Sequence, residues 1–258
     1  MTNLGLKLYS NQLERYKEET VKLLGQFGYI ELFVLPDSLD TLKGWKEFKK
    51  EYDLEFTLHA PHFSNGVNLA DRDFEKRNIE VYEQVKRFKE ELNAQYIIVH
   101  GGIHGNVEET VRQLNKINPP DMRIENKPPV SPRVRDKECV GASIKEIKFI
   151  IDRHPCKFCL DVGHAFCSAV YFGVEQFEYL EQFQALKPDC YHLSDGDFDS
   201  HIDIHYHIGK GDYDWKRIFS IIDTNKNMTL ETVKKSGIES LEFFAQDIVQ
   251  VNKYVEED

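Results

Sequence analysis

The sequence predicts an α/β protein with the (β/α)8 fold, the TIM barrel. Its 258 residues are close to the roughly 250 that one such barrel typically contains. Short apolar, β-branched or aromatic runs alternate with longer segments of helical period along the chain, as in the βα units of a parallel sheet. Eight alternations without a break in composition favour a closed barrel. An open doubly wound sheet is the alternative, because closure cannot be read from a sequence.

The expected strands are short and rich in the side chains that suit a pleated, buried surface. Their boundaries are set where the apolar run gives way to polar residues, glycine or proline. In chain order they are Leu4–Ser10, Tyr29–Leu35, Glu55–Pro61, Tyr96–Gly102, Met122–Lys127, Lys157–Ala165, Cys190–Asp197 and Met228–Val233.

The segments between these strands carry apolar residues at helical spacing. In Phe74–Leu92, for example, Tyr82, Val85 and Phe88 belong to one stripe. Ser143 followed by Glu146 is a capping box, which marks a helix start. Similar patterns predict helices over Glu108–Ile117, Ser143–Arg153, Val174–Ala185, Asp214–Asp223 and Ile238–Tyr254.

Composition and length predict one globular domain over residues 1–258, with 41% hydrophobic and 30% charged residues. No apolar run approaches the ~20 residues that span a bilayer, and the N-terminus lacks the features of a signal peptide. The five cysteines are odd in number and irregularly spaced, which is typical of reduced thiols. We therefore expect a cytoplasmic protein. The net charge of −11 disfavours non-specific binding to phosphate backbones, although bound metal ions can reverse the local field.

Side chains that commonly bind metals fall near the C-terminal ends of the predicted third to eighth strands. In a parallel barrel all these ends open on one face, so residues far apart in the sequence converge there. The nine candidate ligands are His59, His100, Glu125, Asp161, His164, His192, Asp203, His205 and Glu231.

Each of these residues taken alone is more often a satisfied core or rim residue than a ligand. Together they are informative, because carboxylates in apolar strands are unfavourable unless paired or bound to metal. Imidazole and carboxylate ligands suit zinc, with manganese or iron as alternatives, better than magnesium or calcium. Nine candidates exceed the four ligands of one tetrahedral ion, which predicts two or three ions that share carboxylates.

The motifs around these residues resemble those of the xylose isomerase-like TIM barrel superfamily, and within it the endonuclease IV branch (AP endonuclease family 2). The resemblance runs from about His59 to Glu231. It is carried by Leu-His-Ala-Pro at 58–61, Val-His-Gly-Gly at 99–102, Ile-Glu-Asn at 124–126, Leu-Asp-Val-Gly-His-Ala at 160–165, His-Leu-Ser-Asp at 192–195, Asp-Ile-His at 203–205, Ile-Gly-Lys-Gly at 208–211 and Leu-Glu-Thr at 230–232.

Endonuclease IV enzymes hold three zinc ions with nine ligands, and the resemblance puts a residue of the expected type at each position. It implies that His59 and His100 bind one ion, and that Glu125 bridges this ion to a second. The other ligands of the second ion would be Asp161, His192 and Glu231.

The resemblance assigns the third ion to His164, Asp203 and His205. The implied reaction is hydrolysis of a phosphodiester or related phosphate ester by a metal-bound hydroxide. Glu125 or Glu231 would also orient the attacking water.

The substrate is less clearly indicated than the metals. His62 lies close to the rim and Lys210 lies in Gly-Lys-Gly, so both are candidates for substrate binding, although a plain turn is the default for the latter. Endonuclease IV has a tyrosine where this chain has His62. It also has an arginine-containing loop that enters DNA where this chain has the acidic run Leu35–Ser38. DNA is therefore one possible partner beside other phosphate-containing or sugar substrates.

A second interpretation is a metal-dependent sugar or sugar-phosphate isomerase or epimerase. The segment Gly28–Leu32, with Glu31 as a further substrate-binding candidate, resembles the second strand of that branch. Glu125 and Glu231 would then move protons between adjacent carbons. These enzymes bind one ion, and their ligands correspond here to Glu125, Asp161, His192 and Glu231. A catalytically silent scaffold is the third interpretation, and fold alone does not choose among them.

Overall fold

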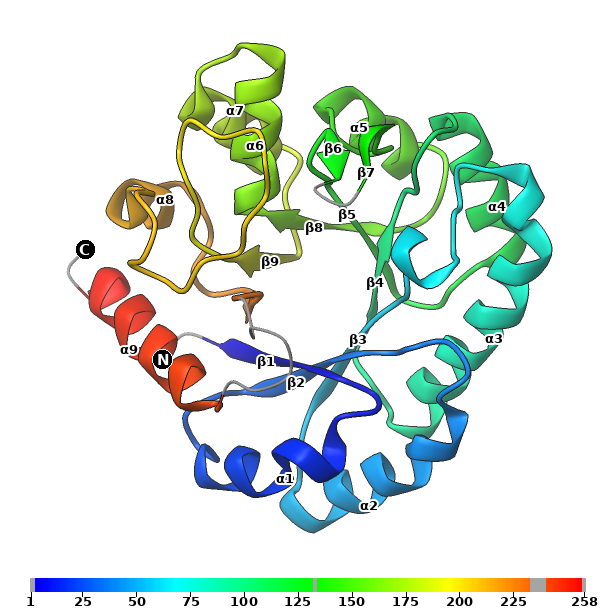
Figure 1. The fold of residues 1–258 in the computed structure, drawn as a ribbon, viewed down its shortest axis with the longest axis vertical. Helices are drawn as coiled ribbons and strands as arrows, with labels where there is room; N and C mark the ends of the chain where they lie inside the picture. Colours follow the sequence, from blue (N-terminus) through cyan, green and yellow to red (C-terminus); the bar gives the residue numbers. More distant parts are fainter. Residues whose placement is uncertain (1–2, 132–133, 233–239, 257–258) are drawn as a thin grey trace.

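Eight parallel strands close into a barrel in the order β1-β10-β9-β8-β5-β4-β3-β2. The computed structural model describes residues 3–131, 134–232 and 240–256, and Figure 1 shows helices surrounding the barrel. The predicted (β/α)8 barrel is confirmed, and the open sheet is excluded. The strands are β1 (Leu4–Tyr9), β2 (Tyr29–Phe33), β3 (Phe56–His59), β4 (Ile97–His100), β5 (Met122–Glu125), β8 (Lys157–Asp161), β9 (Cys190–Leu193) and β10 (Asn227–Leu230).

The helices of the outer layer include all those that the periodicity predicts, and others that it did not single out. The helix predicted over Ile238–Tyr254 begins later, at Glu242; Ile238 lies outside the described residues, as does Val233 at the end of the predicted eighth strand. The α-helices are α1 (Leu13–Lys22), α2 (Leu42–Tyr52), α3 (Glu75–Glu91), α4 (Val107–Ile117), α5 (Ile144–Ile151), α6 (Val162–Phe172), α7 (Gln176–Gln184), α8 (Trp215–Ile221) and α9 (Glu242–Glu256).

Short elements lie on the loops that follow the strands. The 3-10 helices η1 (Leu39–Thr41), η2 (Phe63–Asn65) and η3 (Arg72–Phe74) precede α2 and α3. The segment after β5 forms a small antiparallel pair from β6 (Val130–Ser131) and β7 (Val134–Glu138). Within the described part of the chain, no helix is both long and apolar enough to cross a membrane.

The strand predicted over Lys157–Ala165 is wrong in its second half. β8 ends at Asp161, and α6 starts with the next residue. Asp161 caps this helix, because its Oδ1 accepts a hydrogen bond of 2.7 Å from the backbone N–H of His164. A short apolar run such as Val-Gly-His-Ala does not distinguish strand from helix. His164 therefore lies in the first turn of a helix that begins at the rim.

Successive side chains of each strand point to opposite faces of the sheet, so the strands contribute to two separate apolar regions. Leu4, Leu6 and Leu8 of β1 belong to the large cluster between strands and helices, whereas Tyr96, Ile98, Cys159 and Cys190 form a small separate cluster. The last three of these precede candidate ligands by two residues, so they lie on the same face of the sheet, inside the barrel. The five cysteines are free thiols.

The floor of the barrel is tightly filled. A Cβ atom at Gly5 would lie 2.4 Å from the ring of Tyr29, so only glycine leaves room for this buried tyrosine. The Tyr29 hydroxyl lies 2.9 Å from Thr229 Oγ1 on β10. The barrel interior is therefore filled by side chains at this end.

Candidate metal centre

The nine predicted ligands meet at the C-terminal rim. His59, His100, Glu125 and Asp161 are the last residues of β3, β4, β5 and β8. Register pairs them across neighbouring strands, with His100 beside Glu125 and Asp161 beside His192. Glu231 directly follows β10 and His164 lies in the first turn of α6, while the two remaining candidates lie on the segment between β9 and α8.

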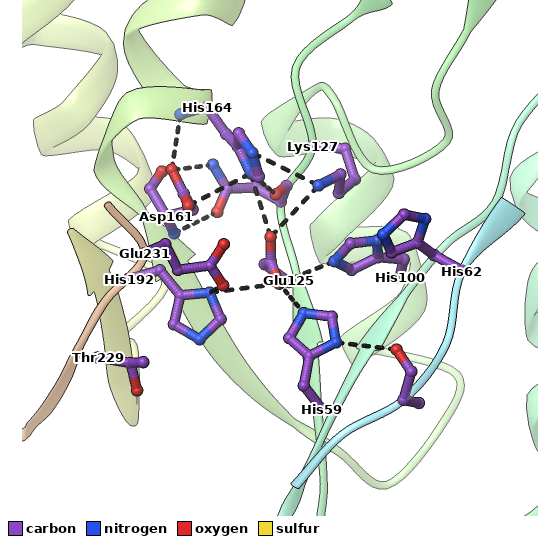
Figure 2. A network of polar contacts seen from close by, with 12 residues as sticks. His59, His62, His100, Glu125, Lys127, Asp161, His164, His192, Thr229 and Glu231 are labelled. Atoms are coloured by element: carbon purple, nitrogen blue, oxygen red, sulfur yellow. Dashed lines mark hydrogen bonds and ion pairs between the residues drawn. The ribbon is translucent and has the colours of Figure 1, made fainter. Parts of the chain in front are cut away.

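Glu125 lies at the centre of the cluster, as Figure 2 shows. Its Oε2 is 3.2 Å from His59 Nε2, 2.9 Å from His100 Nε2 and 3.4 Å from His192 Nδ1. Its Oε1 is 3.1 Å from His164 Nδ1. All these side chains are buried. One carboxylate thus contacts imidazoles from four different parts of the chain.

His192 is held between two glutamates. Its Nδ1 lies 2.7 Å from Glu231 Oε1, and its Nε2 lies 3.0 Å from Glu31 Oε2. Thr229 Oγ1 donates a hydrogen bond of 2.8 Å to the same Glu31 oxygen. Glu31 therefore orients the ring of His192 in the way that carboxylates behind metal-bound histidines do.

A third group stands beside this cluster. Asp203 Oδ2 lies 3.2 Å from His164 Nε2 and 2.6 Å from His205 Nε2. His205 has a positive φ of 60°, a backbone strain that commonly marks functional positions. Its Nδ1 contacts the carbonyl oxygen of Glu231 at 2.6 Å, which ties this group to the end of β10.

Three of the histidines share one arrangement of their ring nitrogens. Nδ1 of His59, of His164 and of His205 contacts a backbone carbonyl, at 2.8 Å, 2.8 Å and 2.6 Å respectively. When Nδ1 carries the proton that it donates, Nε2 keeps its lone pair for a metal ion. All three rings turn Nε2 toward a carboxylate of the cluster.

The described residues form four overlapping groups whose potential ligand atoms lie within 4.8 Å of one another. Asp161 is grouped with Glu125 and His164, whereas the resemblance implied His192 and Glu231 as its partners. Asp161 Oδ2 is buried and has no hydrogen-bond partner among the described residues, a costly state that a cation would relieve. The remaining groups are His59–His100–Glu125, His164–Asp203–His205 and Glu31–His59–His192–Glu231. This donor set fits zinc or a similar transition metal.

Two carboxylates of the cluster, Glu125 and Asp203, are held in their charged form, whereas burial raises the pKa of Asp161. Burial by itself raises the pKa of Glu125, but His100, Lys127 and His192 bring it well below its usual range. Burial likewise opposes ionisation of Asp203, and the charges of His205 and His164 overcome it and lower the pKa. Negative charge is therefore concentrated where cations would bind.

Two lysines that sequence reasoning missed enter this cluster. Lys7 on β1 forms an ion pair with Glu231, and its Nζ lies 3.4 Å from Glu31 Oε1. Lys127 Nζ lies 3.4 Å from both Glu125 Oε1 and His164 Nε2. The signal for Lys7 was a lysine within the apolar run of a strand, which burial permits only beside an opposite charge.

A pocket of about 390 Å³ opens over the cluster. His62 lines it and stacks on the His100 ring with centroids 4.9 Å apart. Tyr9, Phe33 and Phe63 form an aromatic part of its wall. A substrate of modest size can therefore reach the candidate ligands.

Two of the predicted substrate-binding residues do not line this pocket. Glu31 is fully buried against His192 and has no exposed surface. Lys210 is exposed in a turn and borders a separate hollow beside α9, with His207 and Phe243. Both predictions are therefore corrected: the inward face of β2 brings Glu31 beneath the cluster, and the turn directs Lys210 away from it.

Comparisons with known proteins agree with the barrel fold. The family described as xylose isomerase-like TIM barrel matches residues 19–248. Apurinic-apyrimidinic endonuclease 1 of Plasmodium falciparum is 26% identical over 200 residues, 67% of this chain and 32% of the relative, and the Plasmodium berghei protein of that name is similar. This chain thus spans about a third of the length of these curated relatives.

Solved structures resemble the whole barrel. A D-tagatose 3-epimerase-like protein has a TM-score of 0.72 at 17% identity, and the match covers 99% of this chain and 100% of the other. Endonuclease IV from Thermus thermophilus has a TM-score of 0.70 at 19% identity, with the same coverage of both chains. At such identities these likenesses concern the fold alone.

Proposed function

The chain belongs to the xylose isomerase-like TIM barrel family, and we propose that it is a metal-dependent phosphoesterase of the endonuclease IV type. Its substrate would be a phosphodiester or a related phosphate ester. The proposal is supported by the number and arrangement of the ligand residues at the rim rather than by the barrel, which hosts many chemistries.

The observation that carries the proposal is the group His164–Asp203–His205. A single-ion isomerase centre is complete without it. Here the histidines are anchored through Nδ1 to backbone carbonyls, and both turn Nε2 to Asp203 Oδ2. Such preorganisation is what a metal ligand set needs. A centre of two or three ions suits phosphoryl chemistry, in which charge develops on several oxygens at once.

Zinc is the ion that we propose, and the ligands would be the nine residues of the cluster. Bound divalent ions would supply an activated water and would offset negative charge at phosphorus. Glu125 and Glu231 would hold and orient that water, because both carboxylates converge on His192 Nδ1. Tyr9 and Phe63 of the pocket wall would contact the organic part of the substrate and exclude water.

The first test measures zinc per chain after the metal-free protein is reconstituted and freed of excess ion. Two or three equivalents support the proposal, and a single equivalent contradicts it. The second test measures hydrolysis of bis(4-nitrophenyl) phosphate and of a duplex with an abasic site. We expect zinc-dependent cleavage of at least one substrate that a chelator abolishes and added zinc restores. A fully zinc-loaded chain that cleaves no phosphate ester in a broader panel would refute the activity.

The second candidate function is a sugar or sugar-phosphate isomerase or epimerase. It is favoured by the two glutamates that converge on one histidine nitrogen beneath a pocket of about 390 Å³, since this reaction needs two bases on either side of a small substrate. Its test is exchange of a substrate C–H proton with deuterated solvent across a panel of sugars and sugar phosphates. Exchange that Glu231→Gln abolishes would favour this function over hydrolysis, and absence of exchange in the metal-loaded protein would exclude it.

A further inference from the structure

Two lysines with little exposed surface face the pocket from opposite sides of the barrel. Lys7 lies on β1, and Lys127 is the second residue after the end of β5. The strands β1 and β5 are four places apart in the closed order of eight strands. Both side chains line the pocket, and their relative exposures are only 11% and 12%. Lysine is rarely buried to this extent unless it is paired.

Each ammonium group lies among candidate metal ligands. Lys7 contacts Glu31 and Glu231, and Lys127 Nζ is 3.4 Å from both Glu125 Oε1 and His164 Nε2. These carboxylates balance the lysines in the metal-free protein. When metal binds, Glu125 and Glu231 would turn their oxygens to the ions and would balance the lysines less, while Lys7 keeps its contact with Glu31.

The charges of the cluster show what further partner would suit the lysines. The cluster and the adjoining Glu31 together hold five carboxylates, from Glu31, Glu125, Asp161, Asp203 and Glu231, and their negative charges outnumber the two lysines by three. Three divalent ions would change this to a surplus of three positive charges, and two ions to a surplus of one. A buried positive surplus favours a compact anion with several acceptor oxygens. Phosphate has this form and is mostly a dianion near neutral pH.

We propose that Lys7 and Lys127 are specificity-determining residues that bind the phosphoryl oxygens of the substrate from opposite walls of the pocket. The assignment of phosphate rests on the proposed function. Lys127 approaches from the side of His164 and Asp203, and Lys7 from the side of Glu231. Lys7 Nζ is also 5.9 Å from the centre of the Phe33 ring, so an aromatic wall adjoins this end of the anion site.

The test compares the binding of inorganic phosphate by zinc-loaded wild type and by the variants Lys7→Met and Lys127→Met, with isothermal titration calorimetry. Methionine has a similar length and no charge. Each variant is expected to bind phosphate about tenfold or more weakly, the scale of one charge-assisted hydrogen bond. Lys127→Arg keeps the charge and should recover part of the affinity. Lys210→Met makes the same change in a separate hollow and should bind like the wild type.

Zinc content is measured for every variant, so that a lost ion is not mistaken for a lost anion contact. Wild-type phosphate affinity in a zinc-loaded Lys7→Met or Lys127→Met variant would overturn the proposal for that lysine. If a variant does not fold, a crystal structure of the zinc-loaded wild type with phosphate tests the proposal instead. Phosphate within hydrogen-bonding distance of both Nζ atoms supports the proposal, and phosphate bound without them refutes it.

These outcomes are separable from those of the proposed function. If the wild type binds phosphate through the lysines but cleaves no ester, the proposed anion site is supported and the proposed phosphoesterase activity is refuted. If the wild type cleaves esters and the lysine variants bind phosphate with wild-type affinity, the phosphoesterase activity is supported and the proposed anion site is refuted.

Discussion

Replacing Asp203 by asparagine tests the metal centre where the two proposed functions differ. Asp203 Oδ2 is the oxygen shared by His164 Nε2 at 3.2 Å and His205 Nε2 at 2.6 Å. The substitution keeps the size of the side chain and removes its charge. We expect Asp203→Asn to lose the ion of this group while the ions held around Glu125 stay bound.

The size of the effect follows from the place of Asp203 in the group. Changing a residue that only supports a metal ligand typically lowers metal affinity by about 10–100-fold, which is about 1.4–2.7 kcal/mol. Asp203 would contact the ion itself and would be its only charged ligand among the three residues of this group. The loss should therefore reach at least the upper end of that range. The fold should persist, because Asp203 lies on a segment outside the strands and helices.

The assay is zinc per chain at a set of buffered free zinc concentrations, with circular dichroism as the check on folding. Asp199→Asn is the matched control, because it makes the same change at an exposed position of the same segment. The wild type and the control should bind one more zinc ion than Asp203→Asn at the free zinc concentration that saturates the wild type. Equal zinc binding by Asp203→Asn and wild type would refute the reasoning that these three residues form a metal site.

Three further outcomes follow from the structure. Phe88 on α3 is fully buried, so Phe88→Ala should lower the free energy of unfolding by about 3–5 kcal/mol in urea denaturation; a loss below ~1 kcal/mol would mean that the helix is not packed as described. Hydrogen bonds from Lys116 and Arg112 lower the pKa of Glu75 to about 2, so its stabilisation is present above pH ~4.5 and is lost as the pH falls toward 2. The difference in unfolding free energy between Glu75→Gln and wild type should therefore narrow from pH 6 to pH 3, and a constant difference would contradict the ion pairs. Burial lowers the pKa of His205, but Asp203 outweighs burial and raises the pKa to about 9. Because zinc must displace the proton on His205, calorimetry should show zinc affinity rising between pH 6 and pH 8. Zinc binding that does not depend on pH would count against His205 as a ligand.

Much of the site could be predicted because its signals are local. His59, His100 and Glu125 end short apolar strands, and such an end is recognisable without knowing the neighbours. The topology of a parallel barrel then places all strand ends on one face. The fold and the meeting of these residues follow from that reasoning.

Other features depended on which side chains the barrel brings together. Glu31 and Lys210 were expected at the substrate, but the first lies beneath His192 and the second borders another hollow. Asp161 ends its strand by capping α6, so His164 enters the site from a helix.

What the sequence determined by itself was the order of the strands and helices and the kinds of side chain at the rim, because periodicity and strand ends are properties of adjacent residues. The tertiary structure alone decided which charges are neighbours. Lys7 and Glu231 are 224 positions apart and meet because β1 pairs with β10 when the barrel closes. Burial then requires these charges to be paired, since a charge removed from water needs an opposite charge or an ion beside it.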